Sequence, residues 1–93
     1  MKNLTEKQVE NRLTAGVEKL GGMALKFPPL FFAGFPDRII LMPGGIVIFV
    51  ELKKPGKSPR ALQHKVHDKL RRLGFRVDVL ADYEQVDTFL LCL

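Results

Sequence analysis

The chain has 93 residues and a formal net charge of +5, a length that allows one domain with one modest hydrophobic core. Its hydrophobic share of 46% and charged share of 27% are ordinary globular proportions, which excludes a disordered chain. A single cysteine, Cys92, excludes a disulfide framework and a cysteine-ligated zinc or iron–sulfur centre. The N-terminus lacks the apolar stretch of a signal peptide, and no apolar run approaches the roughly 20 residues of a membrane span. We therefore expect a soluble, intracellular protein.

The first predicted element is a helix over residues 6–20. Thr5 and Gln8 have the spacing of a capping box at its start. One face of this helix carries an apolar stripe made of Val9, Leu13, Val17 and Leu20. Gly21-Gly22 then ends the helix.

Three strands are predicted next, over residues 23–27, 37–42 and 46–53. The loop over residues 30–35, which separates the first two strands, contains three Phe residues. Pro-Gly-Gly at residues 43–45 supplies the turn of an antiparallel hairpin between the second and third strands. The third strand is almost continuously apolar and β-branched, which indicates a central strand buried on both faces.

The rest of the chain predicts a helix over residues 59–73, a strand over 75–80 and a last helix over 83–90 capped by Asp82. The apolar stripe of the middle helix consists of Leu62, Val66, Leu70 and Leu73. The strand–helix–strand unit should form a right-handed parallel crossover. The fold class is therefore α/β, of order αβββαβα, with a mixed four-stranded sheet flanked by helices.

Basic residues are concentrated in one stretch, residues 53–76, in which Asp68 is the only acidic residue. Such a stretch favours a polyanion as partner, although by itself it is equally well interpreted as a solvated helix face. It lacks the bulky aromatic face of an interfacial helix, so a membrane partner is not expected. The residues expected to contact phosphates are Lys54, Lys57, Arg60, Lys65, Lys69, Arg71 and Arg72.

Two carboxylates should meet at one edge of the sheet. Asp37 and Glu51 are about equally far from the hairpin turn, so they should lie side by side, and strand alternation places Lys53 on the same face as Glu51. Such a pair suits Mg²⁺ or Mn²⁺, and the backbone carbonyl of Leu52 can add a ligand. Lys53 can stabilise negative charge in phosphodiester hydrolysis. Taken alone, however, Glu-x-Lys is more simply a salt bridge at a strand end.

The chain also carries an ordered set of short motifs: Glu10, Gly21-Gly22, Gly-Phe-Pro-Asp-Arg at 34–38, Pro-Gly-Gly at 43–45, Glu-Leu-Lys-Lys-Pro-Gly at 51–56, Gln63 and Leu-Gly-Phe at 73–75. This set resembles a stand-alone VRR-NUC (virus-type replication–repair nuclease) domain of the PD-(D/E)xK nuclease superfamily. The resemblance implies one nuclease domain over residues 1–93 that cleaves DNA with Mg²⁺ or Mn²⁺. It implies Asp37 and Glu51 as metal ligands, Lys53 as the catalytic lysine, and accessory catalytic roles for Glu10 and Gln63.

Stand-alone members of that family resemble Holliday-junction resolvases, so we expect a homodimeric endonuclease acting on branched DNA in repair, in the cytoplasm of a bacterial or phage-infected cell. Residues 30–35 and 89–93 are candidate interface segments. A flap or single-strand nuclease and a non-catalytic DNA-binding module are the alternatives. His64 and His67 have no third ligand nearby in the sequence and are expected to face phosphates or solvent.

Overall fold

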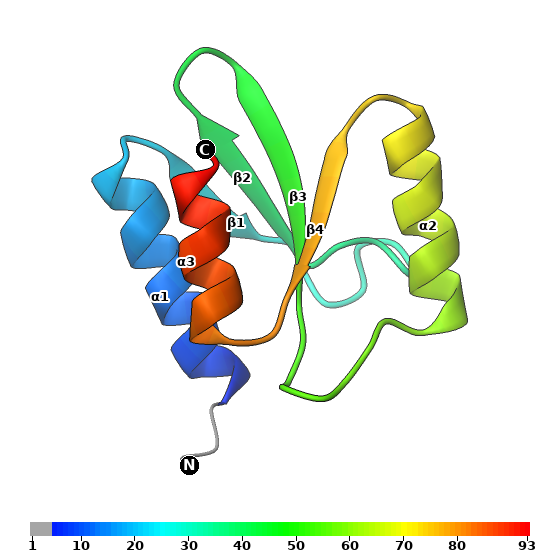
Figure 1. Cartoon of the computed structure of the whole chain (residues 1–93). Coiled ribbons are helices and arrows are strands. Elements are labelled where there is room, and N and C mark those ends of the chain that lie inside the picture. Colours follow the sequence, from blue (N-terminus) through cyan, green and yellow to red (C-terminus); the bar gives the residue numbers. More distant parts are fainter. Residues whose placement is uncertain (1–4) are drawn as a thin grey trace.

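The computed structural model describes residues 5–93, and its elements follow the predicted αβββαβα order (Figure 1). They are α1 (Glu6–Lys19), β1 (Met23–Lys26), β2 (Arg38–Met42), β3 (Ile46–Leu52), α2 (Ala61–Arg72), β4 (Arg76–Leu80) and α3 (Tyr83–Leu91). The type of every element is as predicted, and the boundaries differ by one or two residues. The largest difference is at α2, which begins after Pro59 because Arg60 has extended backbone angles and acts as the N-cap.

The four strands form one mixed sheet in the order β1-β2-β3-β4. β1 pairs with β2 and β2 with β3 in antiparallel fashion, whereas β3 and β4 are parallel and are connected through α2. The predicted mixed sheet is therefore confirmed. β3 is a central strand, as its apolar sequence indicates, and its residues from Ile48 to Leu52 are all buried.

Helices cover both faces of the sheet (Figure 1). α1 and α3 lie together on one face and α2 lies on the other. The core under α1 and α3 contains Val9, Leu13, Val17, Ile40, Ile48, Val50, Leu52, Leu80, Val86 and Phe89. The core under α2 is smaller and contains Phe49, Leu70 and Val77, with Phe27, Phe35, Ile39, Val47 and Val66 packed against it.

Both predicted helix stripes are longer than the faces that the structure buries. Leu20 is 50% exposed because it is the C-cap of α1, beyond the last turn that packs on the sheet. Leu62 and Leu73, at the two ends of α2, are 51% and 62% exposed, so their prediction as buried residues is wrong. The α2 side of the sheet is covered in part by Phe27 and Phe35, which flank the loop before β2 and pack with the α2 residues Val66 and Leu70.

No helix within residues 5–93 has both the length and the apolar character needed to cross a bilayer.

Candidate active site

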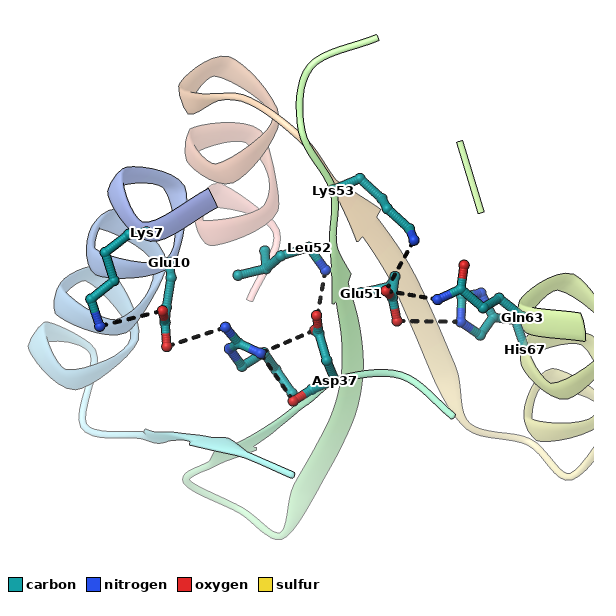
Figure 2. A network of polar contacts seen from close by, with 9 residues as sticks. Lys7, Glu10, Asp37, Glu51, Leu52, Lys53, Gln63 and His67 are labelled. Atoms are coloured by element: carbon teal, nitrogen blue, oxygen red, sulfur yellow. Dashed lines mark hydrogen bonds and ion pairs between the residues drawn. The ribbon is translucent and has the colours of Figure 1, made fainter. Parts of the chain in front are cut away.

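The hairpin of β2 and β3 brings the two predicted carboxylates together. Arg38 pairs with Val50, so Asp37, one residue earlier, lies opposite Glu51, one residue later. The Asp37 Oδ1 atom also accepts a hydrogen bond from the backbone N–H of Leu52 at 3.2 Å. Figure 2 shows these groups around the end of β3. The side-by-side placement that the spacing from the turn predicts is therefore the observed one.

Glu51 is enclosed at the end of β3, with a side chain that is only 5% exposed. Its Oε2 atom accepts a hydrogen bond from Gln63 Nε2 at 3.0 Å and lies 3.6 Å from Lys53 Nζ (Figure 2). Its Oε1 atom is buried without a hydrogen-bond partner. One oxygen of this carboxylate is thus held by two side chains, and the other is free to accept a further ligand.

Both carboxylates are costly to ionise in this position. Burial and, to a smaller extent, the neighbouring negative charge of Asp37 raise the pKa of Glu51 to about 7, against the opposing charge of Lys53. Burial also raises the pKa of Asp37, against the favourable effects of Arg38 and the Leu52 N–H. A cation between the two carboxylates would remove this penalty.

The donor set fits a divalent cation that prefers oxygen ligands. It comprises the free Oε1 atom of Glu51 and the half-buried carboxylate of Asp37, and the backbone carbonyl of Leu52 stays a predicted third ligand. Within residues 5–93 no three His, Cys, Asp or Glu side chains form a complete metal cage. That is compatible with Mg²⁺, which usually keeps several waters and takes one or two carboxylates together with phosphate oxygens of the substrate.

Gln63 is oriented by the start of α2. Its Oε1 atom accepts a hydrogen bond from the N–H of Arg60, the N-cap residue, at 2.9 Å. This contact fixes which end of the amide faces the sheet, so Nε2 points at Glu51. Gln63 therefore caps the helix and holds the carboxylate with one side chain.

Glu10 reaches the site from the opposite face of the sheet, through an arginine. Arg38 is 5% exposed, and its guanidinium lies 3.2 Å from Glu10 Oε2 and 3.4 Å from Asp37 Oδ1. Lys7 Nζ lies 3.6 Å from the other Glu10 oxygen (Figure 2). Arg38 is a site residue for which no role was predicted, although strand alternation puts it on the same buried face as Ile40, where a charged residue needs a partner.

The position of His67 differs from the prediction. His67 is 1% exposed and its Nε2 atom lies 4.0 Å from Glu51 Oε1, so the prediction that it faces phosphates or solvent is wrong. Burial lowers the pKa of His67, which favours the neutral ring. His67 follows Gln63 by four residues, and this i,i+4 spacing on one helix face was the available signal. His64, in contrast, is exposed as expected.

The basic residues predicted to contact phosphates are all exposed. These residues are Lys54, Lys57, Arg60, Lys65, Lys69, Arg71 and Arg72. Arg71 differs from the others because its guanidinium donates to the Val77 carbonyl at 2.9 Å and lies 3.4 Å from Asp68. It is therefore engaged within the fold, while the other six have no such contact among the described residues.

Comparisons with known proteins show the fold and the family. No family model matches the sequence. The chain is 41% identical over 80 residues, 86% of each protein, to "Putative nuclease p44" of Acyrthosiphon pisum secondary endosymbiont phage 1. A solved structure titled "VRR_NUC domain" has a TM-score of 0.85 at 30% identity and covers 92% of this chain and 94% of its own. A second, "VRR_NUC domain protein", shares the fold with a TM-score of 0.73 at 21% identity, over 97% of this chain and 88% of its own. The chain belongs to the VRR-NUC domain family.

Proposed function

We propose that this protein is a nuclease that hydrolyses DNA phosphodiester bonds with Mg²⁺ or Mn²⁺. The observation that carries the proposal is the buried Glu51, which faces Asp37 across the hairpin and keeps one oxygen without a partner. If Glu51 served only as a structural ion-pair partner of Lys53, the nearby carboxylate of Asp37 would have no purpose, because it raises the pKa of Glu51 and so opposes that ion pair. The name of the phage relative p44 supports the same class of activity.

Each side chain of the site has a role that follows from its position. When bound, the divalent cation would promote ionisation of water and offset charge on the phosphate. Asp37 and Glu51 hold that cation, and Gln63 fixes the orientation of Glu51. Lys53, whose side chain is 19% exposed, donates to the phosphate oxygens as their negative charge increases in the transition state. Glu10 has its accessory role through Arg38, which positions Asp37.

The proposal is tested with the purified chain and labelled DNA in Mg²⁺, Mn²⁺ or EDTA. Asp37→Asn and Glu51→Gln should each abolish cleavage while DNA binding persists, because neither changes the shape of the side chain. Glu18→Gln, a change of the same kind on the exposed surface of α1, is the matched control and should cleave normally. Full activity of Asp37→Asn or Glu51→Gln, or full activity in EDTA, would contradict the proposal.

We propose that the protein acts as a homodimer and that its substrate is branched DNA. Paired cuts across a junction require two sites related by a two-fold axis, and the described residues of one chain build one such site. Of the two segments expected at an interface, residues 89–93 bury Phe89, which is 3% exposed, and expose Leu91, which is 86% exposed. We propose the segment around Leu91 for the interface rather than residues 30–35, because the basic side chains beside Phe32 would repel those of a second copy.

Assembly and substrate preference are measured separately. Sedimentation at tens of micromolar protein gives the oligomeric state, and a panel of linear, flap, fork and four-way-junction DNAs of equal length gives the preference. The proposal expects a dimer that cuts junctions in two strands of like polarity. A monomer that cuts flaps and leaves junctions intact would contradict the junction assignment while leaving the nuclease assignment in place.

A further inference from the structure

A loop rich in aromatic residues borders the candidate active site. The loop is closed at its base by a hydrogen bond from the Phe27 N–H to the Asp37 carbonyl at 3.0 Å. Its outer side chains are open to solvent: Leu30 is 98%, Phe31 54% and Phe32 61% exposed. Because Asp37 ends the loop and is also a proposed metal ligand, these apolar side chains and the proposed phosphate site belong to the same part of the molecule.

Two grooves meet at the ring of Phe32. The first, of about 270 Å³, runs along the loop to Asp37 and is also lined by Lys26 and Glu6. The second, of about 390 Å³, lies between the rings of Phe32 and Phe35 and the side of α2 that carries Val66 and Leu70. The basic side chains that line this second groove are Lys65, Lys69 and Arg72. An exposed aromatic ring therefore stands between a carboxylate site and a row of cations.

The aromatic ring is supported from below. Phe32 contacts Phe35 edge to face with ring centroids 5.8 Å apart, and Phe35 contacts the buried Phe49 at 5.4 Å. The loop also packs tightly on α2 at Gly34, which has φ +82°, and where a Cβ atom would lie 2.9 Å from the Leu62 carbonyl oxygen. The exposed rings are thus held in place by the core, so little conformational entropy is lost when a ligand stacks on them.

We infer that Phe31 and Phe32 form a platform on which an unpaired nucleobase of the DNA strand stacks next to the scissile phosphate. Lys65, Lys69 and Arg72 bind the phosphates of that strand. The inference rests on the proposed nuclease function and defines its substrate as DNA with unpaired bases, such as those near a branch point. Aromatic side chains in a basic groove are the usual means of binding single strands without sequence preference, because every base has a π face.

A second copy of the chain is a poorer occupant of this surface. A two-fold contact centred on the loop would place the Lys65, Lys69 and Arg72 rows of two protomers close to one another. Like charges at an interface oppose association. A nucleic-acid strand instead offers both an apolar face for the rings and negative charge for the cations.

The chain contains no tryptophan, so Phe32→Trp introduces a single fluorescent reporter at the platform. We titrate this variant in EDTA with a single-stranded oligonucleotide and with an abasic strand of the same length and charge. The base-containing strand should quench the tryptophan, and the abasic strand should quench it far less. Ala15→Trp, on an exposed site of α1, is the matched control and should respond to neither strand. Phe32→Ala should weaken binding of the base-containing strand by about tenfold and leave the abasic strand unaffected.

Equal quenching by the two strands, or unchanged affinity in Phe32→Ala, would overturn the inference, because phosphate contacts alone would then account for binding. A change in Phe32→Trp emission with protein concentration in the absence of DNA, together with a dimer in sedimentation, would also overturn it and assign the surface to a second copy. These readouts need no cleavage. A failure of the nuclease proposal would therefore appear in the cleavage assay, and a failure of the stacking inference would appear here.

Discussion

Glu51→Gln should make the folded protein more stable at neutral pH, even though it removes a residue that we assign to catalysis. Glu51 has an ordinary pKa of 4.5 when unfolded and a pKa of about 7 when folded. Between these values the folded state binds more protons than the unfolded state, so the free energy of unfolding falls as pH rises through this window. Above pH 7 the folded chain carries a buried charge, and glutamine removes that charge at almost constant shape.

The pKa difference sets the size of the effect. Each pH unit between the two values corresponds to about 1.4 kcal/mol, so the gain in unfolding free energy at pH 8 is about 3 kcal/mol at most. The favourable effect of the Lys53 ammonium, 3.6 Å from Glu51, is already included in this pKa and needs no separate correction. We expect about 1–3 kcal/mol, which for a domain of this size raises Tm by roughly 5–20 °C.

The assay is urea denaturation in EDTA at pH 4.5 and pH 8, with Glu18→Gln as control. The gain should be present at pH 8 and nearly absent at pH 4.5, where the wild-type carboxyl is largely protonated. Mg²⁺ should stabilise the wild-type protein at pH 8 by binding its folded state, and should stabilise the variant much less. If Glu51→Gln is as stable as wild type or less stable at pH 8, the burial of a charged Glu51 is not the cost that the structure indicates.

Three further predictions address the lysines, the basic stretch and the aromatic loop. Lys53→Ala should reduce the cleavage rate by roughly 100-fold, because the Lys53 ammonium lies beside Glu51. Lys54 is exposed, so Lys54→Ala should reduce the rate much less. Equal losses in the two variants would indicate that both lysines only contact phosphates. Replacing Lys57 and Arg60 with Ala should weaken DNA binding to a similar extent on unrelated sequences. It should also make the slope of log affinity against log salt concentration shallower by about 1–2. A slope near zero for the unmodified protein would contradict binding through phosphates. Gly34→Ala should cost roughly 1–3 kcal/mol in denaturation experiments, since its positive φ and its contact with α2 both oppose a side chain, and an unchanged midpoint would mean that the loop can move away.

The elements and the carboxylate pair could be predicted because local rules decide them. Thr5 caps α1 with the expected partner, since Gln8 N–H donates to its Oγ1 at 3.1 Å. Asp82 caps α3 in the same way through the N–H of Gln85 at 2.8 Å. The two-residue alternation of a strand and the turn at residues 43–45 fixed the register that pairs Asp37 with Glu51.

Contacts between elements could not be predicted in the same way. The i,i+4 spacing places His67 on the same face of α2 as Gln63, but the burial of His67 also depends on how α2 is placed over the end of β3. The link from Glu10 to Asp37 through Arg38 likewise requires α1 and β2 to meet, which is a property of the packed layers. Leu62 and Leu73 were misassigned for the same reason, because a periodic stripe does not say how much of a helix the sheet can cover.

The unequal cores on the two faces of the sheet explain how so short a chain can hold a costly site. Ten fully buried apolar residues lie between the sheet and the α1 and α3 helices, against three on the α2 side. Most of the hydrophobic stabilisation therefore comes from the face away from Gln63, His67 and the aromatic loop. The α2 face carries unpartnered polar atoms at Glu51 and His67 and exposed rings at Phe31 and Phe32, while the larger core carries such an atom at Arg38 Nε, beside Glu10. Substitutions under α1 and α3 should accordingly affect folding first, whereas substitutions on the α2 face should affect DNA binding and cleavage first.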